Sequence, residues 1–331
     1  MRTTTQKLVA VAAAAVLGGG LLSSCGAAEK NSSSSSSGGG GKKSIAFIQG
    51  VAGDQFYITM QCGIQDEAKK LGATVKTQGP EKFDPTLQKP IVDSVVASKP
   101  DAILVAPTDV SAMQAPLKAA ADAGIKVVLV DTTVNDPSFA VSQISSDNEG
   151  GGKAAFDAIK QLVPGGGKVL VVSVDPGIST TDARVNGFKA AASADSKFKY
   201  LGVQYSHNEP ATAAKIVTAA LQKDPDIVGV FATNLFSAEG SATGIRQAGK
   251  QGKVKVVSFD AGPDQVKDLQ NGTIQALVAQ QPGTIGTDGV QQAMNALNGK
   301  STTKKIQTGF TIITKDNMNG SGKSAVYKSS C

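Results

Sequence analysis

Residues 45–63, IAFIQGVAGDQFYITMQCG, decide the fold of this chain. Their apolar start predicts a buried strand, a glycine-containing turn follows, and a helical pattern continues through Ile64, Ala68 and Leu71. A strand, turn and helix of this kind form one unit of an open α/β sheet. In such sheets ligands bind at the carboxyl ends of the strands.

One carboxylate and two aromatic rings stand at the junction of this strand and helix: Asp54, Phe56 and Tyr57. Aromatic residues are only 5% of the chain, and there is no Trp, so two adjacent rings at this place are unusual. An acid beside stacking rings predicts a polar, ring-shaped ligand such as a sugar.

Short apolar runs alternate with helical stretches from Ser44 onward. The predicted strands are residues 45–49, 73–77, 102–106, 126–130, 168–174, 200–205, 227–232, 253–259 and 274–279, and the predicted helices are 55–71, 86–98, 111–123, 150–162, 182–194, 211–223, 238–247, 264–271 and 285–297. This alternation predicts an α/β fold with parallel sheets covered on both faces. So many strands favour two doubly wound lobes over one sheet, with a break near residues 145–148.

The first 43 residues predict an exported protein attached to a membrane. A basic start and the apolar run Leu8–Leu22 precede Leu22-Ser23-Ser24-Cys25, which resembles a lipoprotein signal ending at a lipidated Cys25. The alternative is an ordinary secretory signal with an incidental Cys. Residues 26–43, rich in Ser and Gly, predict a flexible tether.

Polar residues follow several of the predicted strands directly. They are Asp131 with Thr132, Asn234, Asp260, and Gln280 with Gln281. Helix N-capping is the ordinary explanation of each one alone. Together with Asp54 they all fall on the same side of parallel sheets, where convergent carboxylates and amides suit vicinal hydroxyls.

Arg184 is the candidate cation of the site, because it stands near the start of the helix predicted at 182–194. Its guanidinium offers five donors in a fixed fork. The alternative is a surface arginine near a helix start, a place that the helix dipole mildly disfavours.

Composition argues against nucleic-acid binding and against common enzyme chemistry. The formal charge is +6, two of the positive charges lie in the predicted leader, and the lysines are scattered along the chain. His207 is the single His, which leaves little material for His-based metal sites or Ser-His-Asp catalysis. The runs Gly150–Lys153 and Gly165–Lys168 lack the Walker spacing, so we expect no cofactor, no metal and no enzyme activity.

Cys62 and Cys331 remain after Cys25 is assigned to lipidation. An even pair in an exported chain predicts a disulfide, and two free thiols are the alternative. A bridge would tie the C-terminus to the first helix. Closing so long a loop could contribute ~4–5 kcal/mol in the chain-entropy model.

An ordered series of segments resembles the ribose- and galactose-type periplasmic sugar-binding proteins of ABC importers. The series is Asp54-Gln-Phe-Tyr57, Leu104-Val-Ala-Pro-Thr-Asp109, Ile125–Asp131, Ser146-Asp-Asn148, Ala183–Phe188, Phe231-Ala-Thr-Asn234, Val256–Asp260 and Ala279-Gln280. The resemblance runs from about Ser44 to Ile313. It implies two lobes joined by three crossings, formed by residues 44–147 with 281–309 and by residues 148–280 with 310–331.

The resemblance also implies a ligand site in the cleft between these lobes. Phe56 and Tyr57 become stacking platforms, and the hydrogen-bonding set is Asp131, Arg184, Asn234, Asp260 and Gln280. Asp54 stands where the ribose-binding type usually has Asn, and Asn208 falls roughly where a further ring is common. The implied partners are a monosaccharide or related polyol and a membrane permease with its ATPase, with the binding protein a monomer outside the cytoplasm.

Two departures from the resemblance argue against ribose as the ligand. Ala106 stands where the ribose binder carries an amide, and Thr132 stands where it carries an Arg. An unpaired buried polar group costs about 1–3 kcal/mol, so ribose hydroxyls would be less well satisfied. Another pentose, a hexose, a sugar alcohol or a cyclitol fits equally well.

Three other classes of function are alternatives to transport: a repressor with the same two-lobe fold, a receptor subunit and an enzyme. A sugar-responsive repressor would need an N-terminal helix-turn-helix, where this chain has a leader and a tether. A receptor subunit for a sugar-like signal, in autoinducer sensing or chemotaxis, is the main alternative to transport. An enzyme would have to turn over its sugar.

Overall fold

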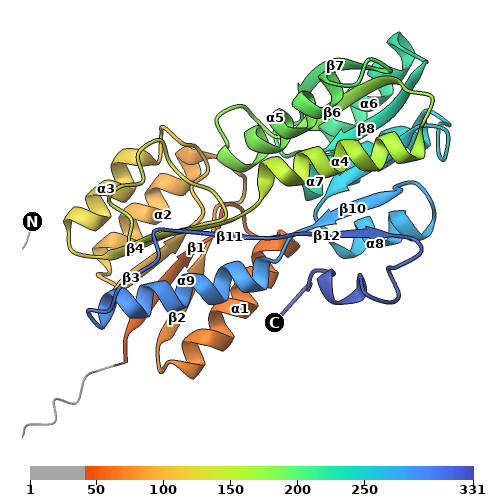
Figure 1. Cartoon of the computed structure of the whole chain (residues 1–331). Helices are drawn as coiled ribbons and strands as arrows, with labels where there is room; N and C mark the ends of the chain where they lie inside the picture. The colour runs from red at the N-terminus through yellow and green to blue at the C-terminus, as the bar shows by residue number, and fades with distance from the viewer. Residues whose placement is uncertain (1–41) are drawn as a thin grey trace, which may run out of the picture. The chain divides into compact units, whose positions relative to one another are not determined.

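Strands and helices alternate through residues 42–331, which are the residues that the computed structural model describes (Figure 1). The lipidation predicted at Cys25 and residues 26–41 of the predicted tether lie outside them. The alternation produces two six-stranded sheets, and each is covered by helices on both faces. This arrangement confirms the predicted α/β class with two doubly wound lobes.

The first sheet has the strand order β11-β5-β4-β3-β1-β2, all parallel. Its strands are β1 (Ser44–Ile48), β2 (Thr74–Gln78), β3 (Ala102–Val105), β4 (Lys126–Val130), β5 (Ser142–Ser146) and β11 (Lys305–Thr308). Helices α1 (Gln55–Lys70) and α9 (Pro282–Leu297) pack on one face, and α2 (Pro85–Ala97) and α3 (Gln114–Asp122) on the other. In β1, Ile45 and Phe47 point toward α1 while Ala46 and Ile48 point toward α2, as the period of two requires.

The second sheet repeats this plan in the order β12-β10-β9-β8-β6-β7. Its strands are β6 (Gly167–Ser173), β7 (Phe198–Tyr205), β8 (Ile227–Ala232), β9 (Lys255–Phe259), β10 (Ala276–Ala279) and β12 (Thr311–Thr314). Helices α4 (Asn148–Leu162) and α5 (Ser179–Ser193) cover one face, where Phe156, Phe188 and Phe259 pack together. Helices α6 (Pro210–Lys223), α7 (Leu235–Gln247) and α8 (Pro263–Gln270) lie on the other side.

The chain passes between the two sheets at three points. These points lie between β5 and α4, between β10 and α9, and between β11 and β12. Figure 1 shows β11 and β12 as consecutive strands that lead from one sheet to the other. The residues at these crossings are therefore the places where the lobes can pivot.

Three strands were not predicted from the sequence: β5, β11 and β12. Each carries only one or two apolar residues, as in SQISS and KIQT, so the apolar runs that mark the other strands are missing. β11 and β12 lie at sheet edges, where one side of the strand needs no partner. β12 is also antiparallel to β10, so the second sheet is parallel except at this edge.

A disulfide joins Cys62 on α1 to Cys331, with the two Cα atoms 5.3 Å apart. It confirms the predicted bridge. Figure 1 places the C-terminus beside α1, although β12 belongs to the other lobe. Residues 315–331 therefore return from the second lobe to the first.

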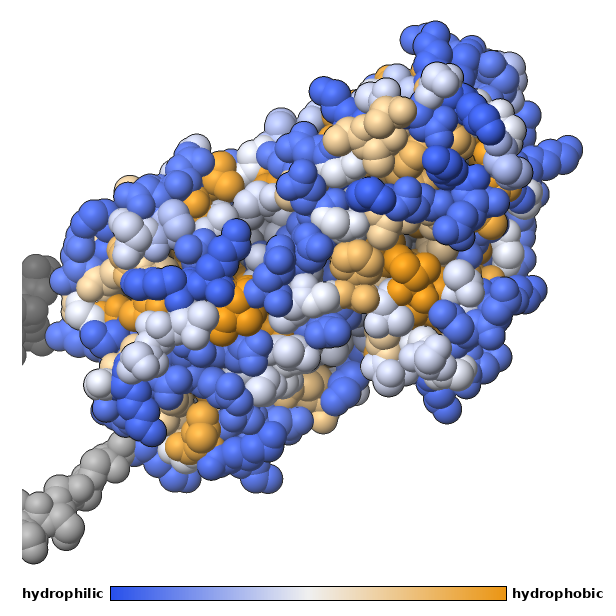
Figure 2. All heavy atoms as spheres, in the orientation of Figure 1, coloured by the Kyte–Doolittle hydropathy of each residue, from blue (hydrophilic) through white to orange (hydrophobic). Residues whose placement is uncertain are grey.

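Apolar side chains of the sheets and helices lie mostly inside. The face seen in Figure 2 is largely hydrophilic, with apolar residues in small separate areas. None of the helices within residues 42–331 has the length and apolar character needed to cross a membrane.

We predict that the double substitution Cys62→Ser/Cys331→Ser lowers the free energy of unfolding by about 2–5 kcal/mol, because it removes a cross-link that constrains the unfolded chain. Urea denaturation at pH 7 measures this difference, and the wild-type chain in excess reductant should match the variant. Equal midpoints for the variant and the oxidised wild type would contradict the prediction.

Candidate functional site

A cavity lies between the carboxyl ends of the two sets of strands, with about 400 Å³ of empty space including its mouth. Both lobes contribute to its lining, which consists of Asp54, Phe56, Tyr57, Phe83, Asp131, Val174, Ile178, Thr180, Thr181, Arg184, Asn208, Asn234, Asp260 and Gln280.

The structure brings together all the predicted ligand-binding residues except Thr132. The buried Thr132 hydroxyl donates to the Pro107 carbonyl, 2.7 Å away, and the residue lines an adjoining groove instead. Ala106 is also buried outside the cavity, and its carbonyl accepts from the Gln88 amide. Thr132 therefore helps to hold the loop that follows β4 and does not face the cavity.

The turn into α1 supplies one wall of the cavity. Asp54 is the N-cap of the helix, and its carboxylate accepts from the Phe56 N–H at 2.8 Å. The rings of Phe56 and Tyr57 meet edge to face with centroids 5.1 Å apart, and the Tyr57 hydroxyl donates to Asp131 at 2.8 Å. Asp54 thus both caps α1 and lines the cavity.

Asp131 and Asp260 occupy equivalent places in the two lobes, directly after β4 and β9. Neither is a helix cap, and both adopt left-handed backbone conformations, with φ of 65° and 75°. Their N–H groups donate to Ile144 and Val278 on the neighbouring strands. Such conformations are unfavourable for non-glycine residues and cluster at functional sites.

Arg184 is buried with 3% of its surface exposed, and its direction is fixed by contacts on three sides. Its Nε donates to Asn148 at 2.9 Å, and its Nη1 donates to the Thr233 carbonyl at 2.8 Å. The guanidinium carbon lies 3.9 Å from the centroid of the Phe259 ring, a cation–π contact. Within residues 42–331 its Nη2 has no partner, so this end of the fork remains available to a ligand.

A glycine lets the helix that carries Arg184 approach its neighbour. Gly152 on α4 faces the Arg184 carbonyl so closely that a Cβ there would overlap with it. Any larger residue at position 152 would therefore push α5, and Arg184 with it, away from α4.

Asp260 is the centre of a hydrogen-bond network beneath the cavity. Its Oδ2 accepts from the Leu235 N–H at 2.9 Å, and its Oδ1 accepts from the Gln280 side-chain amide at 2.6 Å and from the Tyr327 hydroxyl at 3.0 Å. The Gln280 Oε1 in turn accepts from the Ser146 hydroxyl at 2.8 Å. Asp260 is therefore connected to two of the three crossings between the lobes.

Asn234 and Asn208 add an amide pair to the lining. Asn234 caps α7, and its Nδ2 donates to Asn208 Oδ1 at 2.7 Å. Asn208 and the preceding His207 both have left-handed φ, near 55°. The Asn208 side-chain amide therefore keeps donors for a ligand while its oxygen is occupied.

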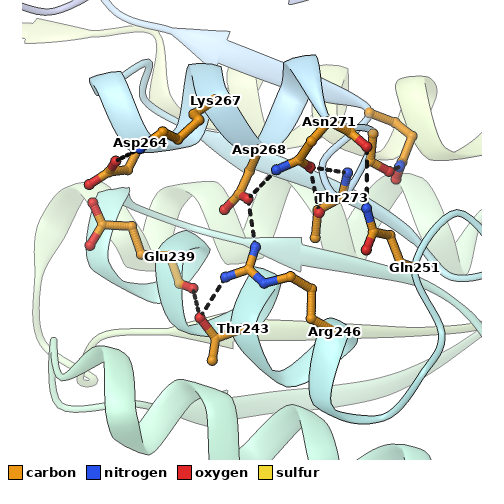
Figure 3. A network of polar contacts seen from close by, with 11 residues as sticks. Glu239, Thr243, Arg246, Gln251, Asp264, Lys267, Asp268, Asn271 and Thr273 are labelled. Carbon is orange, nitrogen blue, oxygen red and sulfur yellow. Dashed lines mark hydrogen bonds and ion pairs between the residues drawn. The ribbon is translucent and has the colours of Figure 1, made fainter.

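A second polar network fixes the helices that follow β8 and β9, the strands before Asn234 and Asp260. Figure 3 shows Arg246 of α7 beside Asp268 of α8 and Thr243. Arg246 Nη1 donates to Asp268 Oδ1 at 2.6 Å, and Arg246 Nη2 donates to the Thr243 hydroxyl at 3.0 Å. None of the residues labelled in Figure 3 lines the cavity. The network therefore supports the site through the orientation of α7 and α8.

The cavity holds three buried carboxylates and one guanidinium. Burial raises the pKa of Asp54 to about 8, and the nearby Asp260 carboxylate adds to this rise. Burial also raises the pKa of Asp131 to about 6, although Arg184 and the Tyr57 hydroxyl counteract it. The pKa of Asp260 is raised by burial as well, against the effects of Arg184 and Gln280. At neutral pH Asp54 is thus mostly protonated while Asp131 is mostly ionised.

Three contacts close the lobes over the mouth of the cavity. Val110 N–H donates to the Gly177 carbonyl at 3.1 Å, and Thr133 N–H donates to the Ser179 hydroxyl at 3.0 Å. Lys82 and Glu209 form an exposed ion pair at 2.9 Å. The structure is therefore a closed form of the two lobes.

Several lining residues were missed by the sequence analysis: Phe83, Val174, Ile178, Thr180 and Thr181. Phe83 comes three residues after a Pro in a loop, where no periodicity marks it. The threonines lie just before Arg184 on α5, and that proximity is the one signal that could have identified them.

The fold and cavity define a two-lobed α/β binding protein with its site between the lobes. The chain belongs to the periplasmic binding protein domain family, whose model matches residues 45–301. It is 31% identical over 274 residues to the ribose import binding protein of Escherichia coli, covering 83% of this chain and 91% of that protein. The family predicted from the ordered segments is therefore confirmed.

Two solved structures from Agrobacterium vitis are similar to this chain, and both are ABC transporter solute-binding proteins with a sugar bound. One holds α-D-tagatopyranose; it is 42% identical, with a TM-score of 0.85 over 87% of this chain and 100% of that one. The other holds D-fucose; it is 31% identical, with a TM-score of 0.82 over 86% of this chain and 100% of that one.

We predict that Asp54→Asn changes how the stability of the sugar-free protein depends on pH. The folded-state pKa of about 8 lies above that of an exposed Asp, ~4, so the folded protein holds this proton more tightly than the unfolded chain. The contribution of the Asp54 proton to the free energy of unfolding is fully present below pH ~4, and it is lost as the pH rises through about 8. Asn cannot titrate, so the variant should gain stability relative to wild type between these limits, by on the order of a few kcal/mol.

Urea denaturation at several pH values from 4.5 to 8.5 measures this difference. Asp93→Asn, which removes an exposed carboxylate from α2, is the matched control. A constant difference between Asp54→Asn and wild type across this range would contradict the assigned burial of the Asp54 carboxylate.

Proposed function

We propose that this protein is an extracytoplasmic solute-binding protein that captures a monosaccharide or related polyol and delivers it to an ABC permease. The observation that carries the proposal is the cavity between the lobes in which the two rings of α1, three acidic side chains and Arg184 converge. Membership in the periplasmic binding protein family and the sugar-bound relatives support the same function.

The proposed ligand roles follow from the donors and acceptors left free in the cavity. Asp54, Asp131 and Asp260 accept from sugar hydroxyls, and Arg184 Nη2 and the Asn208 amide donate to ring or hydroxyl oxygens. Phe56 and Tyr57 cover an apolar face of the sugar ring. Gln280 orients Asp260, and Asn234 orients Asn208, so both act on the ligand through a neighbour.

Binding favours the closed form because the ligand contacts both lobes only there. The first lobe supplies Asp54 and Asp131, and the second supplies Arg184 and Asp260. A ligand shifts such an equilibrium by its difference in affinity for the two forms. We place the lobe boundaries at residues 147, 280 and 309, and the strand membership of the two sheets supports this division.

The proposed ligand is a sugar other than ribose. Ala106 and Thr132 carry neither an amide nor a guanidinium, and neither residue lines the cavity. D-Tagatose is the first candidate, because the relative that is 42% identical holds it. A hexose of this kind has more hydroxyls than a pentose for the three carboxylates to bind.

The protein would act without making or breaking a bond, as a monomer attached to the outer face of the cell membrane through a lipidated Cys25. The sequence Leu22-Ser23-Ser24-Cys25 supports this attachment. More than one acyl chain is needed for stable anchoring. The Ser- and Gly-rich residues that follow would hold the binding domain near its permease without fixing its orientation.

The test is a thermal-shift screen of the wild-type chain against pentoses, hexoses, polyols and inositols, including D-tagatose, D-fucose and D-ribose. A sugar that binds the native state raises the melting temperature. Calorimetry then gives the affinity of the best ligand for the wild type, Asp260→Asn and Arg184→Ala.

We expect each substitution to weaken binding at least ~100-fold, because each removes one buried charge and leaves the opposite charge nearby less well compensated. Asp122→Asn on the exposed face of α3 should bind as the wild type does. The function is refuted if no sugar or polyol raises the melting temperature, and the site is refuted if both cavity variants keep wild-type affinity.

A further inference from the structure

The C-terminal segment, residues 315–331, contacts both lobes on its way from β12 to α1. The Tyr327 N–H donates to the Ala261 carbonyl of the second lobe at 2.9 Å. One residue later, the Lys328 N–H donates to the hydroxyl of Thr59, on α1 of the first lobe, at 2.8 Å. The segment ends at the disulfide between Cys331 and Cys62, also on α1.

The Tyr327 side chain meets three parts of the site at once. It is buried, its hydroxyl accepts from the Gln280 N–H at 3.0 Å, and the same hydroxyl donates to Asp260 Oδ1 at 3.0 Å. Its ring lies against Phe56, with centroids 6.0 Å apart. Tyr327 is not among the residues that line the cavity, so it would act on a ligand through these neighbours.

We propose that Tyr327 is a positioning residue of the ligand site, and that the Cys62–Cys331 disulfide holds it in place. The hydroxyl fixes Asp260 and Gln280 in the arrangement that receives the ligand. This inference rests on the proposed sugar-binding function and adds to it the C-terminal segment, which none of the ligand assignments includes.

The hydrogen bonds of Asp260 explain why one hydroxyl matters. Oδ2 is fixed by the Leu235 N–H, while Oδ1 receives the Gln280 amide and the Tyr327 hydroxyl. These donors set the rotation of the carboxylate and favour its ionised form. Removing the hydroxyl leaves the buried Gln280 N–H without a partner and takes one donor from Asp260.

The disulfide matters because little else holds the end of the chain. Residues 328–331 are exposed, and the hydrogen bond between Lys328 and Thr59 is their one backbone link to α1 among residues 42–331. Chain ends that are not tied down fray. A covalent bond three residues beyond Lys328 therefore limits the movement of Tyr327 away from Asp260.

Tyr327→Phe tests the positioning role, because it removes the hydroxyl and keeps the ring that packs on Phe56. Calorimetry with D-tagatose, D-fucose and D-arabinose as probes, at pH 8 and at pH 5.5, measures the effect. We expect binding to weaken about 10- to 150-fold at pH 8, as for loss of one hydrogen bond to a charged group. The loss should be larger at pH 5.5.

The pH readout separates positioning from a general structural role. Asp260 is faced by Arg184 of α5, by Asp54 before α1, by Asp131 after β4 and by Tyr327. Without the Tyr327 donor, Asp260 takes up a proton at higher pH and accepts less well from a sugar hydroxyl. Tyr200→Phe, half-buried on β7 against Phe188, is the matched control and should bind as the wild type does.

A double-mutant cycle tests the role of the disulfide. Cys62→Ser/Cys331→Ser should weaken binding, and adding Tyr327→Phe to it should weaken binding less than Tyr327→Phe does in the wild type. Circular dichroism checks that each variant is folded. Wild-type affinity in the disulfide-free variant, or a fully additive Tyr327→Phe effect, would overturn the anchoring role.

The outcomes distinguish this inference from the function on which it rests. If the wild type binds a probe and Tyr327→Phe binds it equally well at both pH values, the inference alone is overturned. If the wild type binds none of the sugars in the screen, the proposed function is overturned and this inference with it.

Discussion

The buried guanidinium of Arg184 is the interaction on which the rest of the site depends. It is the one cation among the described residues that line the cavity, and three acidic side chains line the cavity with it. It lowers the pKa of Asp131 and of Asp260 against the rise that burial causes. Without it, the charges of Asp131 and Asp260 would share the cavity with no opposite charge, and an uncompensated buried charge is strongly destabilising. Asn148, the Thr233 carbonyl and the Phe259 ring, all in the second lobe, hold this side chain in place.

The two lobes repeat one arrangement, and the site uses the repeat. Both sheets have the same strand order, and in both an Asp with left-handed backbone follows the equivalent strand, β4 or β9. The lobes differ where the site needs opposite charge. The helix after the first strand brings Asp54 and two rings in one lobe, whereas the equivalent helix brings Arg184 in the other. A ligand held between the lobes therefore meets hydrogen-bond acceptors on the side of the first lobe, and both donors and acceptors on the side of the second.

Much of this arrangement could be predicted from the sequence, because buried parallel strands are marked by apolar runs such as Val127–Val130. The residues that follow such runs fall at one edge of the sheet, which is why Asp131, Asn234 and Asp260 could be grouped before the structure was known. β5, β11 and β12 were missed because edge and polar strands lack that signal. Thr132 was misplaced because position next to a strand end does not tell which way a side chain turns. Tyr327 was missed because only the folded chain brings the C-terminus to Asp260.

The most direct test of the central claim is a crystal structure of this protein with the sugar that gives the largest thermal shift. The account predicts a closed form with one sugar in the cavity, its hydroxyls within hydrogen-bond distance of Asp54, Asp131 and Asp260, and the free end of Arg184 on a sugar oxygen. A sugar bound elsewhere, or bound in the cavity without contact to Arg184, would contradict it.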